Sequence, residues 1–222
     1  MHTTLNIFNT FVIITMCYHY SPAHLNRLKK LYPDKFKKLD YPEYANGFTH
    51  PKVPAATTQG LALFSWGLIP HWTKDWETAI KMRRFCLNAK LETLSEKPSF
   101  RDALQNKQFC ILPAESFYEW QWQDAKGKTK TKFEIKSMHN DPLYLGGLYS
   151  HWTDKNTGEI HETITIITCP ANTLMEKIHN TKKRMPILLD DDSGKQWIEG
   201  KLDIALLQQK AQAQLLVGEV IP

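Results

Sequence analysis

Short runs in which apolar residues alternate with polar ones fill the middle of the chain and limit what it can fold into. Thr163-Ile164-Thr165-Ile166 alternates cleanly within 162–168, as a strand with one buried face requires. Similar runs predict further strands, at 61–66, 109–112, 116–122, 131–135 and 143–149. Helical patterns are fewer and shorter. The pattern predicts an α+β fold: a β-rich single domain with a distorted, barrel-like sheet and flanking helices.

Helix signals occur near both ends of the chain. Ser21-Pro22 followed by Leu25, Leu28 and Leu31 predicts an N-cap, a proline in the first turn and one apolar stripe, ending before Pro33. Further helices are predicted at 170–179, around residue 196 and at 203–214. The stretch 75–101 is polar and loop-like with short helical pieces.

Proline and glycine divide the predicted strands. Residues 41–59 contain three prolines and a glycine and predict a long connection. Pro113 separates the predicted strands 109–112 and 116–122. Gly127, between Asp124 and Lys128, predicts a hairpin turn.

Composition excludes several classes of protein. The 222 residues carry a formal net charge of +5 and an ordinary apolar fraction, as a globular domain does. None of the four cysteines belongs to a CxxC pair, so we expect reduced thiols, no metal site and no cofactor. No apolar run approaches the roughly 18 residues of a membrane span. We expect a cytoplasmic monomer with no obligate protein partner.

The first sixteen residues contain an apolar patch at 11–14 that invites comparison with a signal peptide. No Lys or Arg precedes the patch, and Asn6 and Asn9 interrupt the stretch. Bulky Met16 precedes Cys17, whereas signal cleavage prefers small residues. We therefore expect residues 1–16 to be an extension or a removable leader, and 17–222 to be the functional domain.

Cys17 acquires special chemistry if residues 1–16 are removed. A terminal cysteine carries an α-amine and a thiol on adjacent carbons, and both can condense with one aldehyde to close a thiazolidine. Their reference pKa values are about 7.7–8.0 and about 8.5, so modest help makes both reactive. Without such removal, a small buried hydrophobic residue is the ordinary interpretation, as for Cys86, Cys110 and Cys169.

Three polar residues are further candidates. Glu119 lies within the aromatic segment SFYEWQW; in an apolar site its pKa rises and it can shuttle protons, whereas on an edge strand it is simply solvated. His179 ends a predicted helix and is either a general acid–base or a surface cation at the helix end. Asn88 is equally consistent with an ordinary turn residue.

Basic residues interleave with aromatic ones between 66 and 101. Trp66, Trp72 and Trp76 accompany a group of cations: Lys74, Lys81, Arg83, Arg84, Lys90, Lys97 and Arg101. A second basic cluster covers 182–184. Cations beside rings suit a single-stranded nucleic acid, whose phosphates and bases they contact. Solvated faces of a slightly basic protein are the alternative.

These pieces occur in an order that resembles the SOS response-associated peptidase (SRAP) family. The matching blocks are Met16-Cys17, FSWGLIPHW (64–72), LNAKLETLSEKPSFRDA (87–103), CILPAESFYEW (110–120), TIITCPAN (165–172) and IHNTKKRMPILL (178–189). The resemblance runs from Cys17 to about Leu189. It implies an abasic-site processing protein that binds single-stranded DNA and forms a thiazolidine crosslink through an N-terminal cysteine.

The resemblance also implies roles for residues. The crosslinking cysteine falls on Cys17, the amide that holds the terminal residue on Asn88, the strand carboxylate on Glu119 and the acid–base histidine on His179. For DNA contacts we expect four residues: Lys90, Trp66, Arg101 and Arg184. The family's usual arginine two residues after the asparagine is Lys90 here, which loses the bidentate fork. The Gly-Arg that usually follows the cysteine is Tyr18-His19.

Two other functions remain open. A thiol peptidase, a hydrolase that cuts before Cys17, would use the same residues but would need no free amine. A noncatalytic module would hold single-stranded DNA through its basic, aromatic surface and form no covalent product. The leading hypothesis is a lyase-like DNA–protein crosslinking enzyme for abasic single-stranded DNA.

Overall fold

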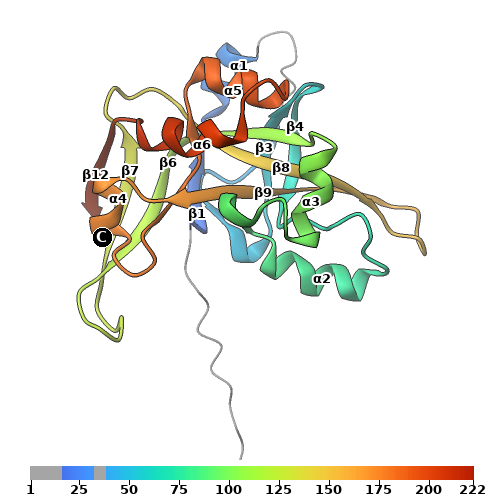
Figure 1. Cartoon of the computed structure of the whole chain (residues 1–222), viewed down its shortest axis with the longest axis horizontal. Coiled ribbons are helices and arrows are strands. Elements are labelled where there is room, and N and C mark those ends of the chain that lie inside the picture. The colour runs from blue at the N-terminus through green and yellow to red at the C-terminus, as the bar shows by residue number, and fades with distance from the viewer. Residues whose placement is uncertain (1–16, 33–38) are drawn as a thin grey trace, which may run out of the picture.

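A computed structural model describes residues 17–32 and 39–222, so the expectation of a leader at 1–16 lies outside the described residues. Five strands form a closed barrel (Figure 1). In order around the barrel they are β8 (Leu143–Thr153), β9 (Ile160–Pro170), β4 (Gly60–Trp66), β3 (Lys52–Thr57) and β6 (Phe109–Trp122). Pairing of β6 with β8 closes the ring. Neighbours are antiparallel except β4 and β9, which pair in parallel.

The remaining strands extend this barrel at its edges. On the outer half of β6 lie β1 (His19–Pro22), which also pairs with β2 (Ala45–Asn46), and β7 (Lys130–Ser137), which pairs with β12 (Leu216–Ile221). On β9 and β8 lie β5 (Asn88–Lys90), β10 (Arg184–Pro186) and β11 (Leu188–Leu189). Short strands therefore bring distant segments to β6 and β9.

Helices cover the barrel from several sides. They are α1 (Leu25–Leu31), α2 (Trp76–Phe85), α3 (Pro98–Gln105), α4 (Thr173–Ile178), α5 (Asp191–Ile198) and α6 (Ile204–Gln212). Single 3₁₀ turns occur at η2 (Gly47–Thr49) and η3 (Leu91–Thr93). Asp75, Asn172, Asp190 and Asp203 cap α2, α4, α5 and α6 by accepting a backbone N–H, as such residues do at helix starts.

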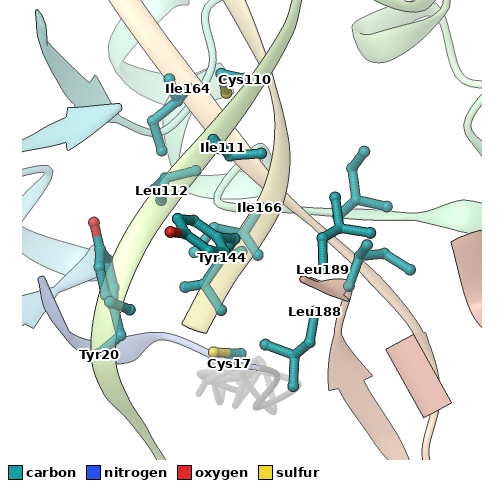
Figure 2. Packing of buried hydrophobic residues seen from close by; sticks show 14 of the residues in the cluster. Cys17, Tyr20, Cys110, Ile111, Leu112, Tyr144, Ile164, Ile166, Leu188 and Leu189 are labelled. Atoms are coloured by element: carbon teal, nitrogen blue, oxygen red, sulfur yellow. The ribbon is translucent and has the colours of Figure 1, made fainter. Parts of the chain in front are cut away.

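The core fills the barrel with aliphatic and aromatic side chains. Figure 2 shows Ile111 and Leu112 of β6, Ile164 and Ile166 of β9, and Leu188 and Leu189 of β11 in one cluster. Fully burying each such side chain contributes about 1.5–3 kcal/mol. Cys17 belongs to the same cluster, at the point where the described chain begins. Cys17 is thus anchored to the core.

The structure confirms the predicted α+β fold with a barrel-like sheet. The predicted hairpin turn is also confirmed, because Gly127 has a φ of 64° and its N–H donates to the Asp124 carbonyl at 3.0 Å. Across the described residues, no helix is long and apolar enough to span a membrane.

Several local predictions are wrong. The expected connection at 41–59 contains the buried strand β3. The two strands predicted around Pro113 are one strand, β6. The first half of β6 pairs with β8 and the second half pairs with β1 and β7. Pro113 lies close to this change of partners, so its missing N–H interrupts little of either ladder. Ser21 does not cap α1, because Ser21 and Pro22 pair with β6 and the helix starts at Leu25. The final strand, β12, was not predicted.

Candidate active site

Four predicted site residues come together from four separate elements. Cys17 directly precedes β1, Asn88 begins β5, Glu119 lies in the outer half of β6, and His179 follows α4. The β1–β6 register, His19 opposite Tyr118, brings Cys17 to the Glu119 end of β6. The parallel pairing of β5 with β9 fixes Asn88 opposite Ile166. These four side chains, which are far apart in the sequence, therefore share one buried site.

Asn88 holds the main chain of the cysteine. Its Nδ2 donates to the carbonyl oxygen of Cys17 at 3.1 Å, and its Oδ1 is buried without a hydrogen-bond partner among the described residues. The preceding Leu87 is itself fixed, because its carbonyl accepts the Trp66 indole N–H at 2.9 Å. Asn88 is therefore a rigid donor with an acceptor atom still to be satisfied.

Glu119 is a buried carboxyl group. The residue is 3% exposed, and Oε1 has no hydrogen-bond partner among the described residues. Burial raises the pKa of Glu119 to about 7, against the opposing effects of the His179 charge and the Trp120 backbone N–H. A carboxyl group with this pKa exchanges protons readily at neutral pH.

His179 is buried beside this carboxyl group and has a defined orientation. Its Nδ1 lies 3.0 Å from the Arg184 carbonyl oxygen and 3.3 Å from the Arg184 N–H. The shorter contact favours a proton on Nδ1 that is donated to the carbonyl.

The segment around His179 is clamped to the end of β6. The Asn180 side chain accepts the Trp122 N–H through Oδ1 at 3.0 Å and donates to the Trp122 carbonyl through Nδ2 at 2.9 Å. Gln121 adds a contact of 2.8 Å to the Lys177 carbonyl. Nothing in the sequence pattern predicted Asn180, because an exposed asparagine after a helix carries no signal of its distant partner.

The Cys17 thiol is buried, and its pKa is raised. Burial raises its pKa well above the usual value, the Glu119 charge raises it further, and the His19 backbone N–H partly offsets the shift. The other cysteines, Cys86, Cys110 and Cys169, are also free and buried, with pKa values raised by burial. Burial thus disfavours the thiolate form of all four cysteines.

A cavity of about 190 Å³ opens next to Glu119. Its lining residues come from β1 and the residue before it, and from η2, β6 and β7: Tyr18, His19, Phe48, Glu119, Trp120, Trp122 and Lys130. Tyr18 packs on Phe48 with ring centroids 4.5 Å apart. The pKa of Tyr18 is raised by burial and by the charges of Glu119 and Cys17, while an Asn88 hydrogen bond lowers it. Tyr18 thus bridges the cavity and the Cys17–Asn88 pair.

The predicted DNA contacts divide into buried and exposed residues. Trp66 is fully buried; its ring meets Tyr20 edge-on at 5.3 Å and lies over Gly47, where a Cβ would come within 3.3 Å. No ring face is left for a base, so the prediction that Trp66 contacts DNA is wrong. Its role is to anchor Leu87, next to Asn88.

Arg184 is also committed to the fold. Its guanidinium group donates to both Glu92 carboxylate oxygens, at 2.5 and 2.9 Å, and to the Thr168 carbonyl at 2.7 Å. In this structure these donors serve Glu92 and Thr168, and Arg184 as a DNA contact stays a prediction. Lys90 and Arg101 are exposed, at the end of β5 and in α3. Both stay predictions as DNA contacts.

The residues described in the structure hold no group of three or more His, Cys, Asp or Glu side chains arranged for a metal ion.

Comparisons with known proteins show the family of this chain. Residues 16–220 match the sequence model of the family described as SOS response associated peptidase (SRAP). The chain is 44% identical over 141 residues to the abasic site processing protein YoqW of Bacillus subtilis, covering 64% of this chain and 58% of that protein. It is 40% identical over 170 residues to YoaM of the same organism, an abasic site processing protein, covering 75% of this chain and 70% of that one.

More distant relatives and a solved structure extend the comparison. The abasic site processing protein HMCES of Xenopus tropicalis is 29% identical over 154 residues, covering 63% of this chain and 45% of that protein. The alignment with YoqW, described above, spans less than two thirds of the length of YoqW. A crystal structure of a protein from Bacteroides thetaiotaomicron, 32% identical, superposes with a TM-score of 0.82 over 93% of this chain and 92% of that one. The chain belongs to the SOS response associated peptidase (SRAP) family.

Proposed function

We propose that this protein processes abasic sites in single-stranded DNA by forming a thiazolidine crosslink through Cys17 after removal of residues 1–16. The relatives named as abasic site processing proteins support the substrate class. The observation that carries the mechanism is the Asn88 hydrogen bond to the Cys17 carbonyl beside the buried Glu119. That arrangement orients the main chain of Cys17, and therefore the amine that must react.

The proposed reaction has two bond-forming stages. The α-amine of Cys17 adds to the aldehyde carbon of the opened abasic sugar and water leaves, which gives an imine. The thiol then adds across the C=N bond: sulfur bonds to carbon and the thiol proton ends on nitrogen. The product is a five-membered thiazolidine and one water, with no change of oxidation state.

Glu119 and His179 supply the proton transfers that these stages need. The abasic sugar is mostly a closed hemiacetal, so a proton shuttle must open it to the aldehyde. With a pKa of about 7, Glu119 can accept and return a proton near neutral pH. His179 protonates the departing hydroxyl and assists the reverse ring opening. Asn88 holds the amine in a near-attack geometry, which contributes more than added nucleophilicity does.

The free amine is the chemical condition for this reaction. An amide nitrogen cannot form an imine, so a chain that retains residues 1–16 should bind DNA but not crosslink to it. We accordingly propose 17–222 as the functional domain and 1–16 as a segment that is absent from the active form.

A thiol peptidase using Cys17 is the second candidate, because the family description contains that activity. Thiolate attack on a peptide needs a deprotonated sulfur, and burial and Glu119 raise the Cys17 pKa well above its usual value. This favours crosslinking, in which the amine attacks first and the thiol closes the ring afterwards.

The test compares two forms of the protein, one with residues 1–16 and one shown by intact mass to begin at Cys17. Each is incubated with single-stranded DNA that contains one abasic site, and then analysed by denaturing electrophoresis and mass spectrometry. We expect a covalent adduct only from the form that begins at Cys17, with the mass of protein plus DNA minus one water. Absence of an adduct from that form would refute the proposal. Salt-sensitive binding without any adduct would instead identify a noncatalytic binding module.

A further inference from the structure

Tyr18 joins two parts of the candidate active site. It directly follows Cys17 and lines the cavity next to Glu119. Its hydroxyl group is hydrogen-bonded to the side chain of Asn88. The same Asn88 side chain donates to the Cys17 carbonyl at 3.1 Å. One tyrosine therefore contacts the amide that holds the cysteine and shares a cavity wall with the buried carboxyl group.

The turn η2 holds Tyr18 in place from two sides. The Tyr18 ring packs on Phe48 with centroids 4.5 Å apart and an interplanar angle of 49°. The Tyr18 carbonyl accepts the Gly47 N–H at 2.8 Å. Gly47 is itself packed so closely on the buried Trp66 ring that a Cβ would come within 3.3 Å of it. The hydroxyl group of Tyr18 therefore has a defined position relative to the core.

The Asn88 amide has two N–H groups to donate, and its orientation decides where they point. One N–H donates to the Cys17 carbonyl. The hydrogen bond from Asn88 lowers the pKa of Tyr18, which is the effect of an N–H donated to a phenolic oxygen. A half-turn of the amide would exchange its nitrogen and oxygen, lose both bonds and place an oxygen against the Cys17 carbonyl. Tyr18 and Cys17 together therefore fix one orientation of Asn88.

Tyr18 acts in this arrangement as a neutral phenol. Burial, and then the charges of Glu119 and Cys17, raise its pKa above the usual value near 10 despite the hydrogen bond from Asn88. The hydroxyl group accordingly keeps its proton at neutral pH. Its contribution is to make hydrogen bonds and not to remove protons.

We propose that Tyr18 is a positioning residue for crosslinking: its hydroxyl group orients the Asn88 amide and, through Asn88, the main chain of Cys17. This rests on the proposed function, because the amine that is held in place is the one that attacks the aldehyde. A glycine, which usually follows the cysteine in the family, has no group for this purpose. Tyr18 thus adds a second hold on Asn88 in this chain.

The first test uses the form of the protein that begins at Cys17 and single-stranded DNA with one abasic site. Single-turnover crosslinking at several DNA concentrations gives a limiting rate and a half-saturating concentration. Tyr18→Phe keeps the ring and removes only the hydroxyl group. We expect the limiting rate to fall about 2- to 12-fold, the factor for one hydrogen bond, at an unchanged half-saturating concentration. Tyr41→Phe, which removes a hydroxyl bonded to the Ala23 carbonyl, should keep the wild-type rate.

A double-mutant cycle shows whether Tyr18 acts through Asn88. In an Asn88→Ala background, Tyr18→Phe should cause no further loss of the limiting rate, because the amide that it orients is gone. A residue that only supports the fold would slow both backgrounds by the same factor. Equal losses in the two backgrounds would therefore overturn the proposed role.

A second readout observes the contact directly in the full chain and needs no DNA. The side-chain amide signals of Asn88 are identified in an NMR spectrum by their absence from Asn88→Asp. Tyr18→Phe should move one of the two amide protons upfield, because that proton loses its acceptor, whereas Tyr41→Phe should leave both in place. Unchanged Asn88 signals in Tyr18→Phe would overturn the inference.

The outcomes distinguish this inference from the proposed function. A wild-type limiting rate in Tyr18→Phe would overturn the role of Tyr18 alone, because the adduct still forms. No adduct from the wild-type form that begins at Cys17 would overturn the proposed function and, with it, the role of Tyr18 in crosslinking.

Discussion

The side-chain amide of Asn88 donates to the main-chain carbonyl of Cys17 at 3.1 Å, although 71 residues separate them in the chain. Both residues are almost fully buried. The bond is made to the backbone and not to the thiol, so it controls where the cysteine nitrogen lies. Replacing Asn88 therefore tests how the amine of Cys17 is positioned without removing a contact to its sulfur.

Asn88→Asp is expected to slow crosslinking by about 5- to 150-fold, because a carboxylate cannot donate to the Cys17 carbonyl and a buried acceptor is left unsatisfied at a cost of about 1–3 kcal/mol. Single-turnover crosslinking at several DNA concentrations measures the rate. Asn46→Asp, at the end of β2, is the control. An unchanged rate in Asn88→Asp would exclude a positioning role.

Cys17→Ala should abolish the stable crosslink while noncovalent binding of abasic single-stranded DNA stays nearly the same. The amine of the variant can still form an imine, but without sulfur the ring cannot close and the imine hydrolyses. Denaturing electrophoresis and anisotropy measure the two properties. Cys110→Ala, which removes another buried thiol, should crosslink normally. A normal yield of adduct from Cys17→Ala would refute the thiazolidine.

Glu119 should make stability depend on pH. Its pKa rises from 4.5 to about 7 on folding, so the folded state binds this proton more tightly than the unfolded state does. The contribution of Glu119 to the free energy of unfolding is complete below about pH 4.5 and is lost as the pH rises through about 7. The loss is on the order of 3 kcal/mol. Chemical denaturation from pH 5 to 8 should show this decline in the wild type and not in Glu119→Gln. Equal pH dependence in both proteins would contradict the assignment.

Asn180 should act as a positioning residue for His179. Its side chain makes two hydrogen bonds to the backbone of Trp122, each contributing about 1 kcal/mol. Asn180→Ala is expected to slow crosslinking about tenfold and to alter its pH profile, because His179 is no longer held at a fixed distance from Glu119. Asn156→Ala, in the turn between β8 and β9, is the control. If Asn180→Ala changes only stability, the role is structural.

Lys90 and Arg184 should behave differently in DNA binding. Lys90 is exposed, so Lys90→Gln should weaken binding and reduce the slope of log Kd against log salt by about 0.7.

Arg184 is paired with Glu92. Because the Glu92 carboxylate is partly solvated, Arg184→Met should lower the free energy of unfolding by about 1–3 kcal/mol and leave the salt slope unchanged. A reduced slope in Arg184→Met would instead support the predicted DNA contact.

Local patterns predicted much of the fold because they report periodicity directly. Alternation at 163–166 and in SFYEWQW identified β9 and β6, and the apolar stripe of Leu25, Leu28 and Leu31 identified α1. The same patterns failed where tertiary pairing overrides local preference. Ser21-Pro22 is a good helix start in isolation but pairs with β6, and Pro54 lies in a buried strand because β4 and β6 flank it.

The sequence by itself determined the β-rich α+β class, the order of the family-like blocks and the identity of the candidate groups at Cys17, Asn88, Glu119 and His179. Only the tertiary structure decided which of these lie together, that Glu119 is buried with a raised pKa, and that Trp66 and Arg184 face inward. The physical reason is that periodicity reveals which side chains share a face. Burial, pairing and pKa depend on segments that pack against that face from elsewhere in the chain.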